Sequence, residues 1–190
     1  MRDSDRSEGS RGLAVRNYSW IGAAAVLLIA IVVGGVRSLV PRPNDLTARE
    51  IVNDHLRSLT ANHLTDVLSS NQHTVKPWFD GRLNFTPPVI DLTSQGFPLL
   101  GGRLDYLNER PIAAVVYRRR EHVINLFIAP AETATDSQPS SQVRDGYNIV
   151  HWTKAGMCYW AVSSVSGAEL GQFAQLLIDQ GSGPSTPTRG

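Results

Sequence analysis

This chain of 190 residues contains a single cysteine, Cys158. A single cysteine excludes a disulfide within the chain and a zinc site built from several cysteines. Cys158 lies between Met157 and Tyr159 in a strongly apolar run, where a lone cysteine is usually a small core residue. We therefore interpret Cys158 as part of the core.

Short catalytic motifs are also lacking. The sequence contains no Gly-x-Ser-x-Gly elbow, no His-Glu-x-x-His and no phosphate-cradling glycine loop. A nucleophile pair of Cys158 with a histidine is an alternative hypothesis, although the apolar neighbours of Cys158 favour its burial. We interpret Asp105 and Glu109 as turn and edge residues rather than as a paired acid and base. We predict that the chain is not an enzyme and has no cofactor.

A large excess of charge of either sign is missing as well. Eighteen Lys and Arg residues balance seventeen Asp and Glu residues, which leaves a formal net charge of +1. This balance gives no strong case for a nucleic-acid partner, and we predict none. The dense basic cluster at 118–120 (RRR) is interpreted as a solvated hairpin turn between two apolar strands.

Against these absences stands one long run without charge, at residues 20–36 (WIGAAAVLLIAIVVGGV). With Tyr18 before it and Leu39 and Val40 after it, the apolar stretch reaches about 20 residues, enough to cross a bilayer as a helix. It has no polar stripe, unlike the surface helix of a soluble domain. The competing interpretation is a cleaved signal peptide, but the run is longer than usual and ends without a good Ala-x-Ala site. We predict a transmembrane helix at 18–40.

This anchor divides the chain into four parts. We predict a short cytoplasmic tail at 1–17, the transmembrane helix, an extracytoplasmic sensor-like domain at 41–180 and a disordered tail at 181–190. Arginines lie on both sides of the anchor, so the positive-inside rule favours a cytoplasmic N-terminus only weakly. A single N-terminal anchor followed by a long domain usually exports that domain. We therefore predict a cytoplasmic N-terminus and an extracytoplasmic C-terminal domain.

The domain is predicted to begin with a helix. Thr47 and Glu50 have the spacing of a capping box, and Leu46 and Ile51 have the spacing of a hydrophobic staple. Apolar residues then recur every three or four positions as far as Val67, which predicts one apolar helical face. The sequence Ser-Ser-Asn at 69–71 is expected to end the helix.

Strands are predicted for most of the remaining domain, and a second helix for its end. The runs at 112–117 and 122–129 are mostly apolar, which is typical of central strands with both faces covered. Further strand segments are expected at 78–79, 83–85, 99–107, 147–152 and 157–163, and a mobile loop at 131–143. Ser166 and Glu169 predict the capping box of a final helix. The expected class is α+β, an antiparallel sheet flanked by an N-terminal and a C-terminal helix.

Three histidines are weak candidates for a metal site, namely His55, His63 and His73. His55 and His63 are eight residues apart on the predicted helix, and His63 falls on its apolar face, where a core histidine is the commoner case. Asp66 and Asp80 could add oxygen ligands, although no spacing requires them. A metal site usually needs three or more oriented ligands, so we treat the metal as unknown.

A second candidate site combines aromatic and basic residues around a predicted turn. Lys76, Trp78, Phe79 and Arg82 place two aromatic rings beside two cations. We interpret them as a recognition surface or a structural latch. The competing interpretation, which we weight more heavily, is that Trp78 and Phe79 close the core of the sheet.

Three segments of the chain carry a resemblance to a known family. They are HLRSLTANHLTDVLSSNQHTVKPWFDGRLNFTPPV, then GFPLLGGRLDYLNERPIAAVVYRRREHVINLF, then GYNIVHWTKAGMCYWAVSSVSGAELGQFAQLL. Together they resemble the extracytoplasmic part of bacterial membrane-spanning anti-sigma factors, over about residues 45–178. The string QHTVKPWFDGRLNF is the most specific part of the resemblance. The resemblance implies a protein that holds an extracytoplasmic-function sigma factor at the inner face of the membrane and releases it after an outside signal, often through proteolysis.

The chain departs from that family before the anchor. The family's sigma-binding module normally precedes the anchor and often carries a His-x-x-x-Cys-x-x-Cys zinc motif. Here about eighteen residues precede it, without His or Cys, and such a tail is too short to bury a core. We expect either a shortened chain or a stand-alone sensory half, and no sigma-binding residue of the family can be assigned to a position here.

The resulting functional prediction is a membrane-anchored, non-catalytic regulator of the anti-sigma type in the bacterial inner membrane. Its expected partners are the membrane, an envelope protease or periplasmic ligand, and a sigma factor, the last directly only if a longer N-terminus exists. The alternative is a membrane-tethered periplasmic module that binds a ligand or metal independently of any sigma factor.

Overall fold

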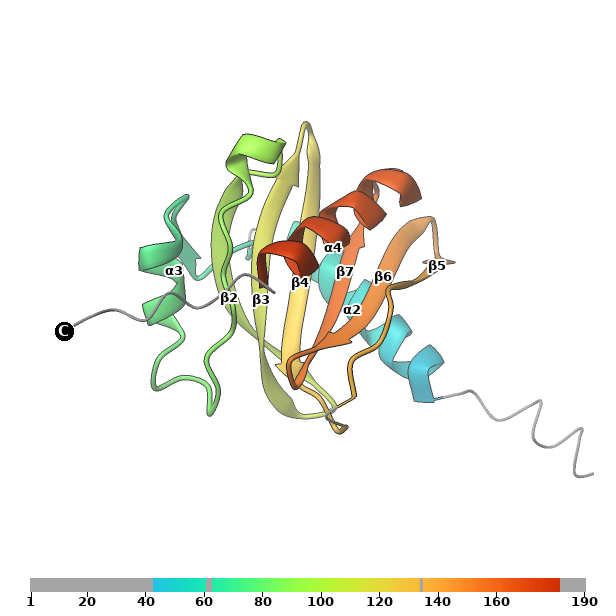
Figure 1. The fold of residues 1–190 in the computed structure, drawn as a ribbon, viewed down its shortest axis with the longest axis horizontal. Helices are drawn as coiled ribbons and strands as arrows, with labels where there is room; N and C mark the ends of the chain where they lie inside the picture. Colours follow the sequence, from blue (N-terminus) through green and yellow to red (C-terminus); the bar gives the residue numbers. More distant parts are fainter. Residues whose placement is uncertain (1–42, 61–62, 134, 182–190) are drawn as a thin grey trace, which may run out of the picture. The chain divides into compact units, whose positions relative to one another are not determined.

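The computed structural model describes residues 43–60, 63–133 and 135–181 (Figure 1). The predicted cytoplasmic tail and transmembrane helix lie outside these residues, as does the predicted C-terminal tail beyond Gly181, which is the last residue of a helix. Of the helices within the described ranges, none combines the length and apolar character needed to cross a membrane.

Seven strands form one antiparallel sheet with a helix at each end of the domain, which confirms the predicted α+β class. The order across the sheet is β1-β2-β3-β4-β7-β6-β5. The strands are β1 (Val67–Leu68), β2 (Leu99–Leu107), β3 (Arg110–Arg119), β4 (His122–Pro130), β5 (Ser140–Arg144), β6 (Tyr147–Lys154) and β7 (Met157–Ser163). The helices are α2 (Pro43–Thr60), α3 (Gln72–Trp78) and α4 (Gly167–Gly181), with a short 3-10 turn η1 (Thr93–Gln95).

The two strands with mostly apolar runs lie at the centre of the sheet, as predicted. β4 pairs with β3 on one side and with β7 on the other. Residues 112–117 of β3 and 124–128 of β4 are buried without alternation. Figure 1 shows the reason, since α4 crosses one face of the sheet and α2 passes behind the other. The apolar runs are therefore explained by burial on both faces.

The face under α4 holds the larger core, and its packing is apolar. Leu170, Phe173, Ala174 and Leu177 of α4 are buried against the sheet, as the helical spacing predicted. Phe173 packs edge-on against Tyr117 of β3, with ring centroids 5.0 Å apart.

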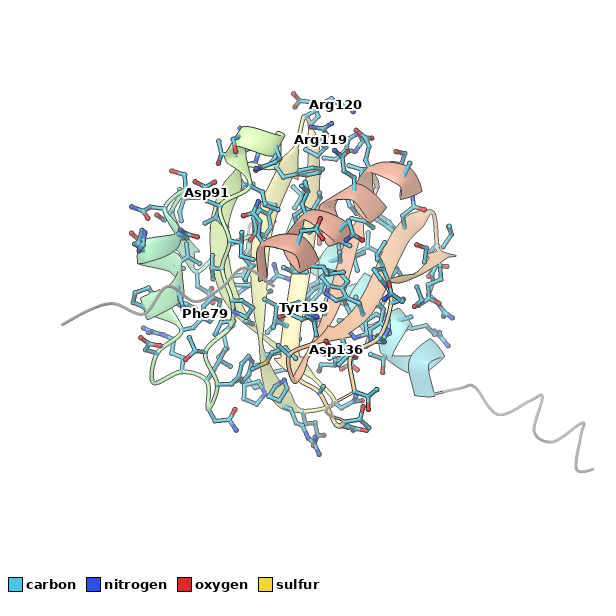
Figure 2. The ribbon with its side chains drawn as sticks, viewed as in Figure 1. Phe79, Asp91, Arg119, Arg120, Asp136 and Tyr159 are labelled. Atoms are coloured by element: carbon cyan, nitrogen blue, oxygen red, sulfur yellow. The ribbon has the colours of Figure 1, made fainter. Side chains whose placement is uncertain are left out.

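The start of α4 is fixed by a cap and by the β3–β4 hairpin. The predicted capping box is confirmed, because Glu169 N–H donates to Ser166 Oγ at 3.3 Å and that hydroxyl donates to Glu169 Oε2 at 3.0 Å. Arg119 and Arg120 extend from the hairpin tip (Figure 2) and both bond the Glu169 carboxylate, Arg119 Nε at 3.2 Å. The basic cluster forms the predicted hairpin, but Arg119 is half-buried rather than simply solvated.

The first helix begins earlier than predicted. α2 starts at Pro43, and proline is favoured at the first position of a helix because its missing N–H needs no partner there. Thr47 is therefore a helical residue, and the predicted capping box at Thr47 and Glu50 is wrong. Glu50 Oε1 instead accepts a hydrogen bond from Asn108 N–H, 3.1 Å away in the β2–β3 turn.

The first helix also ends earlier than predicted. α2 stops at Thr60, and Val67 belongs to β1 rather than to a helical face. Asp66 N–H donates to Gly102 O at 2.9 Å, and the Asp66 carboxylate accepts from Leu104 N–H at 3.0 Å. Pairing with β2 thus outweighs the helical pattern over 66–68, because helix propensity is weak beside tertiary contacts.

Three other segments differ from the sequence predictions. The strand predicted at 83–85 is reduced to an isolated bridge between Leu83 and Asp80. Trp78 ends the helix α3 rather than lying in a strand, and Asn71 caps that helix by accepting from His73 N–H at 2.8 Å. The segment 131–143, predicted as a mobile loop, runs into the edge strand β5. It is held by Asp136, which bonds Lys154 Nζ at 2.8 Å and Ala155 N–H at 2.9 Å.

Candidate functional site

Polar side chains are concentrated beneath α2, in contrast to the apolar packing beneath α4. Five of the six buried polar or charged residues in the described part of the chain lie in this region. We call them the buried polar cluster; its members are Asp54, His55 and Ser58 of α2, Arg103 of β2 and Asn125 of β4. Each is at most 4% exposed. Burial of such groups is costly unless they are hydrogen-bonded, so their partners decide how firmly α2 is held.

Arg103 is the charged centre of the buried polar cluster. Its Nε and Nη2 both donate to Asp105 Oδ2, at 3.0 and 2.8 Å, and Nη1 donates to Leu64 O at 3.2 Å. The guanidinium also lies over the ring of Phe127, 5.5 Å from its centroid. Burial lowers the pKa of Arg103, while the adjacent Asp105 carboxylate raises it. Arg103 therefore remains the cation of a partly buried ion pair.

Asn125 joins Arg103 to α2. Its Oδ1 accepts from Arg103 Nη1 at 3.4 Å, and its Nδ2 donates to Ser58 Oγ at 3.0 Å. Ser58 Oγ in turn donates to the backbone carbonyl of His55 at 2.7 Å. A continuous chain of hydrogen bonds therefore runs from β2 through β4 into α2.

Two atoms of the buried polar cluster lack a hydrogen-bond partner among the described residues. They are Oδ2 of Asp54 and Nδ1 of His55. The other oxygen of Asp54 is paired with the exposed guanidinium of Arg57. A buried polar atom without a partner loses its hydration without compensation. The α2 interface is thus less fully satisfied than the core on the opposite face.

His55 is held neutral by its surroundings. It is 1% exposed, and its ring meets the Tyr147 ring edge-on with centroids 5.1 Å apart. Burial, with a smaller contribution from the charge of Arg103, lowers the pKa of His55 from 6.5 to about 4. Protonation of this histidine would therefore place a second cation in the buried polar cluster.

An open hollow lies beside the cluster, between α2 and the β2–β3 hairpin. Its lining combines four carboxylates, two arginines, one amide and one exposed aromatic ring: Glu50, Asp54, Asp105, Glu109, Arg49, Arg57, Asn53 and Tyr106. Acidic side chains outnumber basic ones, so the hollow suits a cationic ligand better than an anionic one.

The three histidines proposed as metal ligands are not brought together. His55 is buried under α2, His63 follows the helix rather than lying on its apolar face, and His73 is exposed on α3. His63 Nε2 lies 2.6 Å from Asp66 Oδ1, a local pair on the surface. Within the ranges that the structure describes, no three His, Cys, Asp or Glu side chains form a group that could hold a metal ion.

The predicted recognition surface is divided between core and surface. Phe79 is fully buried and belongs to the core beside β2 (Figure 2), so it cannot contact a partner. Trp78 is half-buried, while Lys76 and Arg82 are exposed. Arg82 lies over the Trp78 ring at 4.4 Å and donates from Nη1 to Trp78 O at 2.6 Å. The core interpretation therefore holds for Phe79, and a surface of Lys76, Trp78 and Arg82 remains.

Cys158 and His151 form a close pair, which gives a partner to the histidine that the alternative hypothesis from the sequence left unspecified. Their side chains lie 3.1 Å apart, from His151 Nε2 to Cys158 Sγ, on the strands β6 and β7. Burial raises the pKa of the Cys158 thiol and lowers the pKa of His151. Both shifts oppose a thiolate–imidazolium pair, which is what a cysteine nucleophile needs. The sequence feature that could have predicted this contact is the turn at 155–156, because it folds β6 back onto β7 and brings positions 151 and 158 close together.

The buried polar cluster was also missed, because each strand residue looked ordinary alone. Arg103 stands in a run of mixed polarity, and Asn125 interrupts the apolar run of β4 without breaking it. A buried asparagine at the centre of an apolar strand was the one local signal. Comparison with protein-family models, with curated proteins and with solved structures finds no match for this chain.

Proposed function

We propose that this chain is a membrane-anchored regulatory protein of the anti-sigma-factor type, without catalytic activity of its own. In this proposal the apolar segment at 18–40 spans the inner membrane of a bacterium with the N-terminus in the cytoplasm. The domain that begins with α2 then lies on the periplasmic side, where it receives an envelope signal, and α2 relays that signal toward the anchor.

The observation that carries this proposal is the way α2 is built into the domain. The apolar segment at 18–40 ends three residues before Pro43, the first residue of α2. Ala48, Ile51 and Val52 of this helix are completely buried against the sheet. A displacement of the sheet would therefore move α2, and a helix moves as a rigid element over its length.

The resemblance to anti-sigma factors supports the same proposal from the sequence. Its most specific string, QHTVKPWFDGRLNF, begins with α3 and includes the core residue Phe79. The exposed side chains beside that core residue, Lys76 and Arg82 with the half-buried Trp78, would be available to an envelope protein or ligand.

Co-expression with a neighbouring sigma factor tests the proposal. The chain, with any coding sequence continuous with its 5′ end, is produced in bacteria together with the extracytoplasmic-function sigma factor encoded beside it. We expect the sigma factor to sediment with the membrane fraction and its reporter promoter to stay silent. Deletion of residues 18–40 is the matched control, and it should move the complex to the soluble fraction. A sigma factor that stays soluble and active beside the full chain would reject the proposal.

Protease access tests the orientation separately. A tag on the C-terminal side of α4 should be digested in intact spheroplasts if the domain is periplasmic. Digestion only after lysis would place the domain in the cytoplasm and would remove the envelope-signal part of the proposal.

A second candidate function is a membrane-tethered module that binds a small cationic ligand, and the hollow beside α2 favours it. Glu50, Glu109 and the exposed ring of Tyr106 could hold an amine through ion pairs and a cation–π contact, since Asp54 and Asp105 are already paired with Arg57 and Arg103. Spermidine should then raise the melting temperature of the protein, and Glu109→Gln should weaken that effect. An equal response of the wild type to spermidine and to sodium chloride of matched ionic strength would reject this candidate.

A further inference from the structure

The two helices that cover the sheet both bury apolar residues, but only the interface of α2 also contains the buried polar cluster. On one face, α4 presents four buried apolar residues and a capped first turn. On the other face, α2 covers the buried polar cluster, which includes two atoms without a partner in the described part of the chain. Removing α4 would expose apolar surface to water, whereas removing α2 would also return several polar groups to water. Undocking α2 also exposes the apolar residues Ala48, Ile51 and Val52, but the polar groups regain hydration and offset part of that cost.

We propose that α2 is a releasable strap, which protonation of His55 detaches from the sheet while the sheet and α4 stay folded. This inference concerns the domain itself and does not depend on a sigma factor. Local opening of this kind is common, because stability is unevenly distributed through a protein.

The groups that face His55 make it the natural trigger. The charged groups around it are the guanidinium of Arg103 on β2, which is paired with Asp105, and the buried carboxylate of Asp54, which is paired with Arg57. Tyr147 of β6 contacts the imidazole, and Arg144 of β5 is its partner in the β5–β6 ladder, so both project toward the α2 face. The strand β7 presents the apolar residues Trp160 and Val162 to this face, and β6 adds the histidine His151, whose ring packs against Trp160. No strand therefore offers the imidazolium an unshared carboxylate among the described residues.

The direction of the pH effect follows from the two protonation states of the strap. In the docked state the pKa of His55 is about 4, and in the detached state we take the ordinary value of 6.5. The detached state therefore binds the proton more readily, and acidification below about pH 6.5 favours it. Between pH 7.5 and pH 5.0 this linkage increases the ratio of detached to docked α2 by about 30-fold.

Hydrogen exchange on the full chain in lipid nanodiscs tests the strap. Amide exchange is followed by mass spectrometry at pH 7.5 and pH 5.0, and the rates are corrected for the intrinsic effect of pH. We expect protection over residues 51–60 to fall by about 30-fold at pH 5.0, while protection of β3, β4 and α4 stays within about twofold. Unchanged protection of 51–60, or equal losses in α2 and α4, would overturn the proposal.

Substitutions identify the titrating group. His55→Leu should make the protection of α2 equal at the two pH values, and His55→Gln serves the same purpose if the leucine variant does not fold. His122→Gln is the matched control, since this half-buried histidine lies at the β3–β4 hairpin and bonds Ser164. It should keep the wild-type response to pH. A response that persists in a folded His55 variant would reject His55 as the trigger.

Discussion

The amide of Asn125, on the central strand β4, donates a hydrogen bond to the hydroxyl of Ser58 on α2 across 67 residues of chain. Both side chains are buried, and the bond measures 3.0 Å. A buried polar bond of this kind adds little net stability, but it penalises any arrangement that leaves one partner alone. It therefore fixes where along the sheet α2 can dock.

The first prediction concerns this bond. Ser58→Ala leaves the Asn125 amide buried without that acceptor, and we expect it to lower the free energy of unfolding by about 1–3 kcal/mol. Asn125→Leu removes the donor to Ser58 and also one acceptor of Arg103, so it should lower the free energy of unfolding at least as much. In the double variant the two losses should overlap by about 1 kcal/mol, because the residues are in direct contact.

Urea unfolding followed by circular dichroism measures this cycle. Ser141→Ala, an exposed position on the edge strand β5, is the control and should change stability by less than about 0.5 kcal/mol. Strictly additive losses would mean that the Asn125–Ser58 bond contributes nothing.

The second prediction concerns two glycines with opposite surroundings. Gly101 has φ +152° and faces β1, so a side chain there would overlap the carbonyl of Val67. We expect Gly101→Ala to cost more than about 2 kcal/mol, because backbone must move to admit the methyl group. Gly171 lies in α4 with open space around it, and Gly171→Ala should stabilise the protein by about 0.5–1 kcal/mol. Thermal unfolding of both variants checks the pair, and a tolerated Gly101→Ala would contradict the close approach of β1.

Elements with a strong local pattern could be predicted from the sequence. The final helix was predicted with its cap at Ser166 and its buried face, because helical spacing, cap and burial all agree there. The central strands were also predicted, since a short run of apolar residues bounded by turns is typical of a buried strand. Predictions succeeded where local and long-range preferences coincide.

Predictions failed where long-range pairing decides the structure. Val67 fits a helical face in sequence, yet the hydrogen bonds of Asp66 to β2 place this segment in the sheet. The buried polar cluster joins residues from 54 to 125, and no local pattern connects Ser58 with Asn125. The three candidate histidines also lie in separate surroundings, because His55 is buried in α2 while His73 is exposed on α3.

The third prediction separates core from surface around α3. Phe79→Ala should cost about 3–5 kcal/mol, because the ring is fully buried and its removal leaves a cavity. Arg82→Ala removes an exposed cation–π contact and should cost less than about 1 kcal/mol. Chemical unfolding distinguishes the two. If Lys76 and Arg82 contact a partner, the double alanine variant should keep its stability and lose the response to the envelope signal. A response equal to that of the wild type would reject this surface.

The fourth prediction concerns the carboxylate that ties α4 to the β3–β4 hairpin. The hydrogen bond from Arg119, followed by that from Ser166, lowers the pKa of Glu169. The ionised form therefore stabilises the fold above the ordinary pKa of 4.5, and this contribution disappears as the pH falls below the lowered value. Glu169→Gln should lower the melting temperature at pH 7, and this deficit should shrink as the pH falls below 4.5. Glu121→Gln, exposed in the same hairpin, should have no such effect. A deficit of Glu169→Gln that does not shrink on acidification would point to packing instead of charge.

The fifth prediction concerns the reactivity of Cys158. Burial raises the pKa of its thiol, so a smaller fraction is thiolate at neutral pH than in an ordinary cysteine. We expect iodoacetamide at pH 7.5 to modify Cys158 more slowly than it modifies glutathione. In urea the same cysteine should react at the ordinary rate, which is the internal control. A folded-state rate faster than that of glutathione would mean that His151, 3.1 Å from the sulfur, stabilises a thiolate. The pair would then be a nucleophile rather than part of the packing.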